Sequence, residues 1–286
     1  MRNLRLSART QVTDREYARL LTRKESIGYY VIMSGDDRKM GDLMPSVEYR
    51  PSSEAWATYG ETLKRLILTD SLKRVCEVGG GANPALSIDF ISGNGVDYTI
   101  LDISEPELQK APAGYKTIVG DICNSTLAVT DRFDLVFSQM LAEHVSDAEL
   151  FHRNVRSLLV DGGFACHFFP TLYAAPFVLN RLVPEAIASW ILDLAAPRDR
   201  HRHDKFPAFY RWCRGPTRRQ IKRLEDLRFA VLRYTGFFGH GYYYQKLPPI
   251  RVVHEWLTQI LLRHPSPYLT SFAVVLLRRE PDPPRS

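Results

Sequence analysis

Short apolar runs recur through the middle of the chain, separated by intervals that are long enough for a helix. Four of them, at residues 74–78, 97–102, 117–122 and 131–138, have the length and composition of buried strands, and a fifth strand ends the segment at residues 158–168. Two further runs, at residues 227–234 and 271–278, would complete the same sheet. Strands that alternate with helices in this way predict an α/β fold with a doubly wound, mostly parallel sheet.

The first of these runs leads directly into three consecutive glycines, Gly79-Gly80-Gly81. Such a turn lets the backbone approach a ligand closely. A dinucleotide fingerprint would place its third glycine at Pro84, which has no amide hydrogen, and a phosphate loop would need a lysine, which first follows at Lys110. The carboxylate of Glu77 would repel a pyrophosphate and attract a cation. The turn therefore favours a positively charged nucleoside.

The run from Glu77 to Gly81 resembles motif I of class I S-adenosylmethionine-dependent methyltransferases, in which an acidic residue and any residue precede Gly-x-Gly. Later segments follow the family in order. Glu143-His144-Val145, shortly after the fourth strand, is similar to the type 11 group, and Gly162-Gly163 precedes the fifth strand. The resemblance covers roughly residues 60 to 170 and implies a seven-stranded, Rossmann-like sheet with helical cap insertions.

The resemblance also implies S-adenosylmethionine as the cofactor. The glycines would face its methionine portion, Glu77 would favour its positive end, Asp102 would hold the ribose, and Asp121 with the amide of Ile122 would meet the adenine. The full set of residues expected at the cofactor is Glu77, Gly79, Gly80, Gly81, Asn83, Asp102, Ile103, Asp121, Ile122, Ser138 and Gln139. Taken singly, a glycine turn is also typical of an ordinary loop, and an aspartate after a strand is also typical of a helix cap.

His144 is the candidate catalytic residue. Its ordinary pKa lies near neutrality, and the segment after the fourth strand borders the transfer site in the family. A base is needed only when the acceptor starts protonated, as a hydroxyl does. The alternative is that Glu143-His144 only orients the start of a helix. Some quinone-directed relatives hold a divalent metal with acidic residues here, but Met140 stands three positions before Glu143, so no metal is predicted.

The chain is expected to divide into a core and additions to it. The predicted parts are an N-terminal helical and aromatic cap at 1–60, the cofactor-binding core at 61–170, an inserted cap at 171–225, the completion of the sheet at 226–280 and a flexible tail at 281–286. A helix is predicted at 249–263, before the last strand.

The positive charge of the chain is local. The net charge is +6, yet residues 198–223 alone carry ten arginines and lysines against two aspartates. Three explanations stay open for this basic block: a solvated surface, an acceptor with a phosphate or carboxylate group, or an anionic membrane or nucleic acid, with nucleic acid ranked last. Because residues 172–194 are largely apolar, peripheral membrane contact through 171–223 is the favoured form of the third.

Four cysteines without a C-x-x-C pair, and an N-terminus without a long apolar run, predict a cytoplasmic protein with free thiols. The sequence thus predicts a methyltransferase that acts on a small-molecule or lipid-linked acceptor, on oxygen. The alternative is a regulatory or interaction module that binds S-adenosylmethionine without transferring its methyl group. A nicotinamide oxidoreductase is disfavoured by Glu77 and Pro84.

Overall fold

The computed structural model describes residues 45–172, 207–239 and 248–282. The chain divides into two units, residues 1–42 and residues 43–286, and the second contains all of the described residues. Residues 1–44 of the predicted N-terminal cap and most of the apolar segment at 172–194 lie outside the described residues.

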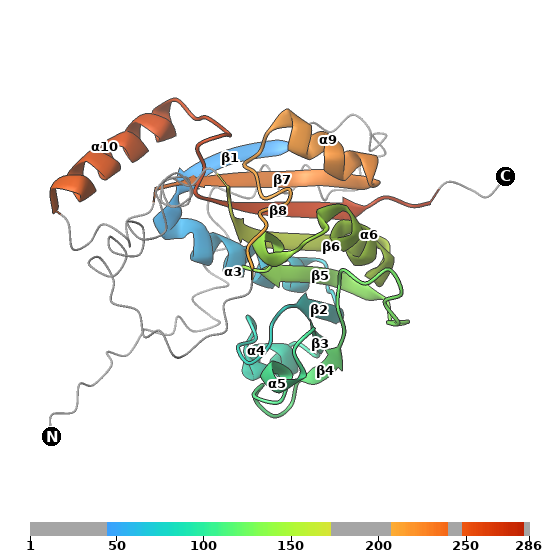
Figure 1. Cartoon of the computed structure of the whole chain (residues 1–286). Helices are drawn as coiled ribbons and strands as arrows, with labels where there is room; N and C mark the ends of the chain where they lie inside the picture. Colours follow the sequence, from blue (N-terminus) through green and yellow to red (C-terminus); the bar gives the residue numbers. More distant parts are fainter. Residues whose placement is uncertain (1–44, 173–206, 240–247, 283–286) are drawn as a thin grey trace, which may run out of the picture. The chain divides into compact units, whose positions relative to one another are not determined.

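One eight-stranded sheet organises the second unit (Figure 1). Its strands are β1 (Ser46–Pro51), β2 (Arg74–Val78), β3 (Asp97–Asp102), β4 (Lys116–Val119), β5 (Phe133–Gln139), β6 (Leu159–Pro170), β7 (Phe229–Phe238) and β8 (Phe272–Arg279). They lie in the order β1-β7-β8-β6-β5-β2-β3-β4, and every pair is parallel except the two that β8 makes with β6 and β7. The predicted mostly parallel α/β fold is confirmed, with eight strands where seven were expected.

The additional strand is β1, which falls in the region predicted as a helical and aromatic cap. It pairs in parallel with β7, and the ring of Tyr49 stacks on that of Phe238 with centroids 5.3 Å apart. The partner strand lies more than 180 residues further along the chain. Since the strand is short and its partner distant, no local pattern predicts it.

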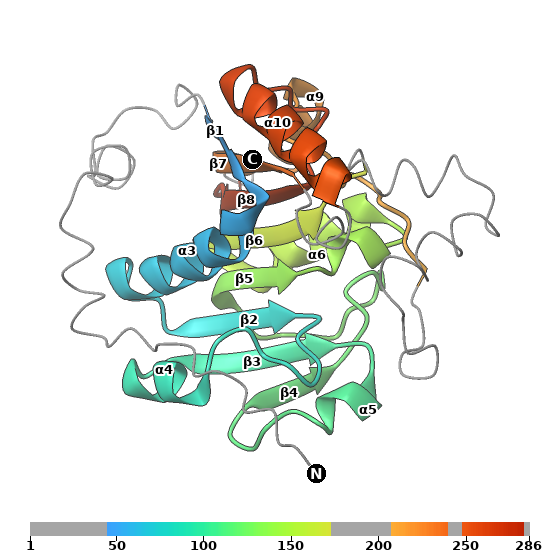
Figure 2. The same cartoon turned by 90° about the vertical axis from the view of Figure 1, so that its left-hand side faces the viewer.

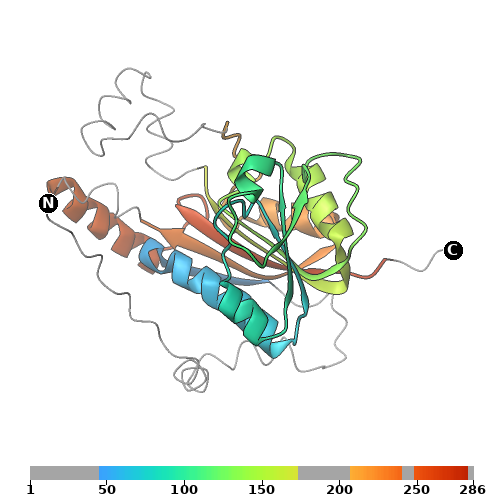
Figure 3. The same cartoon turned by 90° about the horizontal axis from the view of Figure 1, so that it is seen from below.

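The helices cover both faces of the sheet. They are α3 (Ala55–Thr69), α4 (Ile88–Gly93), α5 (Glu105–Leu108), α6 (Ala148–Leu158), α9 (Arg218–Asp226) and α10 (Pro248–Arg263), with single 3-10 turns η2 (Ser52–Glu54) and η3 (Ala142–His144). Figure 3 shows the sheet nearly edge-on, with α3 in blue on one side and α6 in light green on the other. Because both faces are covered, the central strands β2 and β5 are buried almost throughout.

The inserted region is partly integrated into the core. Of its described residues, Cys213 and Leu224 are buried in the main hydrophobic cluster, and the ring of Trp212 stacks on that of His152 in α6. Arg156 of α6 also forms an ion pair with Asp282, the second residue of the predicted tail.

Candidate active site

The glycine turn after β2 has a backbone that requires glycine. Gly79 has a φ of 78° and Gly81 a φ of 45°, both in the left-handed region. A Cβ on Gly79 would lie 2.8 Å from Cδ1 of Leu141. The amide of Gly79 donates a hydrogen bond to the carbonyl of Leu101 (2.8 Å), which fixes the turn at the carboxyl end of β3.

Glu77 lies beneath this turn. Its carboxyl group accepts hydrogen bonds from the amide of Ala85 (3.2 and 3.1 Å to the two oxygens) and from the hydroxyl of Tyr98. The side chain is buried, and burial raises its pKa to about 7 in spite of these hydrogen bonds. The structure therefore places Glu77 where it shapes the turn from inside.

A cavity of about 410 Å³ opens at the carboxyl ends of β2, β3 and β4. Of the residues predicted from the sequence, Gly79, Asp102, Ile103, Asp121, Ile122 and His144 line it. Its other lining residues are Val78, Leu101, Gly120, Cys123, Met140, Leu141, Val145, Ser146 and Pro207. In an α/β sheet this edge is where ligands bind, so the cavity is the candidate site.

Two carboxylates stand at the cavity. Asp102 Oδ1 accepts a hydrogen bond from the amide of Ser104 (2.8 Å), and Asp121 Oδ1 accepts one from the amide of Cys123 (2.8 Å). The cap of α5 is the Ser104 side chain, so Asp102 is not a helix cap. Burial raises the pKa of Asp102, because desolvation outweighs the backbone amides that point at its carboxylate.

Six predicted cofactor residues do not line the cavity: Glu77, Gly80, Gly81, Asn83, Ser138 and Gln139. Gly80 faces Glu77, since a Cβ there would lie 2.7 Å from Glu77 Cδ. Ser138 is buried and its hydroxyl is 2.8 Å from Nδ1 of His167, while Asn83 is exposed to solvent. These residues support the turn or the strand behind it.

Sequence reasoning did not assign Met140 or Pro207 to the cofactor cavity. Met140 has a φ of 52°, unusual for a residue with a side chain, and its amide donates to the carbonyl of Phe168 (2.8 Å). This bend aims the segment after β5 at the cavity. Pro207 comes from the inserted region and has no sequence pattern that indicates the site.

His144 reaches the cavity from η3. Its Nδ1 lies 3.0 Å from the carbonyl oxygen of Pro207, which can only accept a hydrogen bond. In the neutral ring Nδ1 therefore carries the proton and Nε2 the lone pair. Nε2 lies 3.9 Å from Oε1 of Glu143, a buried carboxyl whose pKa is raised to about 7 by desolvation.

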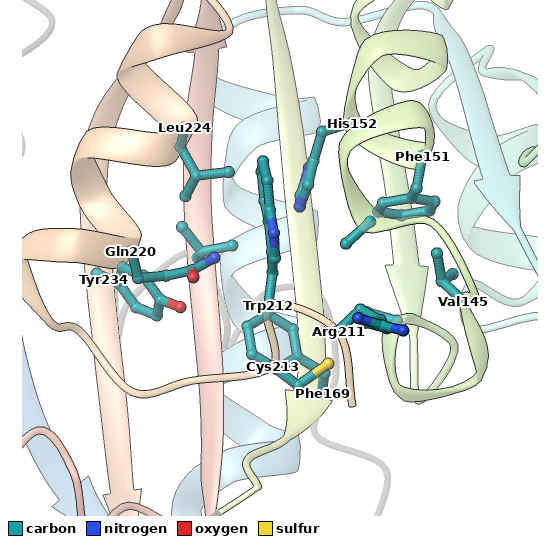
Figure 4. A pocket seen from close by; sticks show the side chains of 13 residues that line it. Val145, Phe151, His152, Phe169, Arg211, Trp212, Cys213, Gln220, Leu224 and Tyr234 are labelled. Carbon is teal, nitrogen blue, oxygen red and sulfur yellow. The ribbon is translucent and has the colours of Figure 1, made fainter. Parts of the chain in front are cut away.

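A second hollow lies between α6, α9 and residues 211–213, and it is only about 10 Å³ in volume. Figure 4 shows Trp212 between His152 and the side chains of Gln220 and Tyr234. This space is about that of one water molecule, so it is a packing defect of the core and not a ligand site.

Two further properties of the described residues bear on the class of protein. In the part of the chain that the structure describes, no helix combines the length and the apolar character needed to cross a membrane. Within the same ranges, no group of three or more histidine, cysteine or acidic side chains is placed to hold a metal ion.

Comparison with known proteins gives one match to a family. Residues 76–167 match the model of methyltransferase family 11, whose description is methyltransferase domain. No curated protein matches the chain.

Several solved structures are similar in fold. An S-adenosylmethionine-dependent methyltransferase from Mesorhizobium loti is 18% identical, with a TM-score of 0.42, over 77% of this chain and 100% of its own. One from Clostridium acetobutylicum is 11% identical, with a TM-score of 0.45, over 93% and 99%. The N-methyltransferase NodS from Bradyrhizobium japonicum, in complex with S-adenosyl-L-homocysteine, is 11% identical, with a TM-score of 0.45, over 78% and 86%. At such identities and scores the similarity assigns neither acceptor nor reaction.

The matched segment runs from β2 into β6 and includes the glycine turn, Asp102, Asp121 and His144. Of the residues that carry the motif resemblance, Gly79, His144 and Val145 line the cavity, together with Asp102 and Asp121. Residues 76–167 of this chain therefore match a methyltransferase domain.

Proposed function

We propose that the protein transfers a methyl group from S-adenosylmethionine to a hydroxyl oxygen of a small-molecule or lipid-linked acceptor. The observation that carries this proposal is the cavity at the carboxyl edge of the sheet, where the glycine turn and the carboxylates of Asp102 and Asp121 come together.

The residues present fit this cofactor. A volume of about 410 Å³ is within the usual range for sites that hold a molecule of this size. Gly79 has no side chain, so its backbone can lie close to the methionine portion of the cofactor. Two carboxylates favour a ligand with a positive sulfonium and hydrogen-bond donors over one with phosphates.

Asp102 and Asp121 would have separate tasks. Asp102, at the end of β3, would accept hydrogen bonds from the ribose hydroxyls. Asp121 follows β4, and its carboxylate together with the amide of Ile122 would meet the polar edge of the adenine. Ile103, which is 60% exposed, would pack against the adenine base and become buried when the cofactor binds.

When bound, S-adenosylmethionine supplies a methyl group on a positively charged sulfur, an excellent leaving group. The protein then has to orient the acceptor and accept its proton. Nε2 of His144 holds a lone pair at the cavity and would take that proton. The Pro207 carbonyl would hold the ring in this tautomer.

Oxygen is proposed as the acceptor atom because a hydroxyl is the acceptor that needs such a base. The variant His144→Gln tests this. We expect kcat to fall by about 10² to 10⁴, the usual contribution of a general base, with little change in cofactor affinity. A variant with full turnover would refute the role of His144 and leave cofactor binding intact.

Calorimetric titration with S-adenosylhomocysteine tests the cofactor site. The wild-type protein should bind, and Asp102→Ala should bind at least about tenfold more weakly, as expected when a charge-assisted hydrogen bond is lost. Asp97→Ala is the matched control, since Asp97 begins the same strand and forms an exposed ion pair with Lys116. No binding by the folded wild-type protein, or equal binding by Asp102→Ala, would remove the proposal.

Transfer of a labelled methyl group to fractions of a cell extract separates an enzyme from a binding module. A labelled product supports the proposal, and its chemistry identifies the acceptor. Binding of S-adenosylhomocysteine without any labelled product would favour a regulatory or interaction module.

An anionic acceptor is part of the proposal, because Arg211, Arg218 and Arg219 are exposed. Other cations of the basic block are already engaged: Lys222 is paired with Asp226, and Arg223 lies over the ring of Trp212 at 5.3 Å. We place the protein in the cytoplasm, which is supported by its four free cysteines.

A further inference from the structure

The outer face of α10 exposes large apolar side chains. Seven of the thirteen such side chains exposed in the described residues lie between Val252 and Leu269. Five belong to the helix itself: Val252, Val253, Trp256, Leu257 and Ile260. Trp256 alone keeps 62% of its surface in solvent. A concentration of this kind on one element marks an interaction surface.

The five side chains form a continuous stripe. At 3.6 residues per turn they fall within about 140° of the helix circumference. The opposite side faces the protein: α10 contacts β1 and β7, and Thr258 lies against Gly239. Figures 1 and 2 show α10 beside the β1–β7 end of the sheet. We call these five residues the α10 stripe.

The C-terminal end of the α10 stripe carries positive charge. Arg263 and His264 are exposed, and by helical spacing they continue the line of the stripe at its C-terminal end. Glu255 is the only carboxylate between residues 248 and 263, and it forms an ion pair with Arg251 (3.5 Å). An apolar stripe with cations at its end is complementary to a lipid surface with anionic headgroups.

The aromatic side chains on and beside the stripe favour lipid over a second copy of the chain. Tyr268 and Leu269, which are also exposed, would add a further contact after the helix. Tryptophan and tyrosine are enriched where a protein meets the headgroup region.

We propose that the α10 stripe docks the protein on an anionic lipid surface. The helix lies in the plane of the interface, and its apolar side chains enter about 5 to 10 Å, to the boundary of headgroups and acyl chains. Arg263 remains at the level of the phosphates. This docking site goes beyond the proposed methyl transfer and does not depend on it.

Vesicle co-sedimentation of the full chain tests the proposal, with vesicles of phosphatidylcholine alone and of equal parts phosphatidylcholine and phosphatidylglycerol. We expect binding to the mixed vesicles to exceed binding to the neutral ones. Tryptophan fluorescence should shift to the blue on binding, and Trp256→Phe should lose most of that shift. Arg263→Gln should weaken binding to the mixed vesicles about fivefold, since a cation near such a surface contributes about 1 kcal/mol.

Leu257→Glu and Leu68→Glu form a matched pair of variants. The two leucines are 46% and 43% exposed, on α10 and α3 respectively. Leu257→Glu should bind vesicles at least about tenfold more weakly, because an apolar contact is lost and a carboxylate is added at an anionic surface. Leu68→Glu should bind like the wild type.

Equal vesicle binding by the two glutamate variants would overturn the proposal, as would wild-type protein that binds neither kind of vesicle. Sedimentation velocity without lipid tests the other possible occupant, a second copy of the chain. A wild-type dimer that Leu257→Glu converts to monomer, with no vesicle binding, assigns the stripe to a second copy and overturns lipid docking. Titration of the same proteins with S-adenosylhomocysteine shows that they are folded and tests the cofactor site independently.

Discussion

The hydroxyl of Tyr98 donates a hydrogen bond to Oε2 of Glu77, beneath the glycine turn that borders the cofactor cavity. Tyr98 is in β3 and Glu77 in β2, so this bond joins the turn to the neighbouring strand. Glu77 in turn accepts a hydrogen bond from the amide of Ala85, on the far side of the glycine turn. The turn is thus held from inside by two buried side chains.

The first prediction follows from this bond. Tyr98→Phe should weaken S-adenosylhomocysteine binding about five- to tenfold, because a buried carboxyl loses a partner and the turn loses a restraint. Isothermal titration calorimetry checks this. Tyr234→Phe is the control, since the hydroxyl of buried Tyr234 also donates a hydrogen bond, in its case to the backbone carbonyl of Arg214 (2.8 Å), in a part of the core that does not line the cavity. Both variants should lose thermal stability, and equal affinities would contradict the prediction.

The second prediction concerns the pH dependence of stability through Glu77. Its folded pKa is about 7, above the value of 4.5 expected when unfolded. The stability that this shift contributes is full below about pH 4.5 and is lost as pH rises through about 7. Glu77→Gln imitates the protonated group, so between about pH 6 and about pH 9 it should lose about 1.4 kcal/mol less stability than the wild type. Urea unfolding at several pH values measures this, and parallel curves would be the contrary result.

The third prediction concerns acid. Burial lowers the pKa of His152 to about 3, so the unfolded chain takes up a proton below about pH 6.5 while the folded chain stays neutral. Stability should therefore fall as pH decreases from about 6.5 towards 3. His152→Phe removes this group and should retain roughly 2 kcal/mol more of its neutral-pH stability at about pH 4.5. Substitution of exposed His264 by Phe serves as control and should leave the acid limb unchanged.

The fourth prediction tests the turn itself. Gly79→Ala should reduce S-adenosylhomocysteine affinity by at least about tenfold, since a φ of 78° is strained for alanine and the new Cβ would displace the Leu141 side chain, which lines the cavity. Gly60→Ala provides the comparison, because nothing lies within 4 Å of a Cβ at that position in α3. That variant should gain up to about 1 kcal/mol of stability with unchanged affinity. Similar affinities in the two variants would show that the backbone of the turn is not part of the site.

The sequence predicted the site residues that stand at the ends of strands or shortly after them. The placement of Asp102, Asp121 and His144 at one cavity follows from strands that run parallel and end at the same edge. The burial of Glu77 beneath the turn did not follow, because it depends on the contact with Tyr98 in the neighbouring strand.

Two other features depend on contacts between distant residues. Pro207 reaches the site from an insertion and meets His144 only in the folded chain. Strand β1 is recognised only through its ladder with β7. Patterns within a short window carry no information about either.

The ladder between β1 and β7 also orders the events of biosynthesis. Ser46 lies opposite Arg233 and Pro51 opposite Phe238, so β1 is synthesised more than 180 residues before the strand with which it pairs. Until β7 has been synthesised, β1 has no strand to pair with and the sheet lacks this edge strand. Closing so large a loop is slow, and nascent chains that stop before residue 229 should leave this strand available to chaperones.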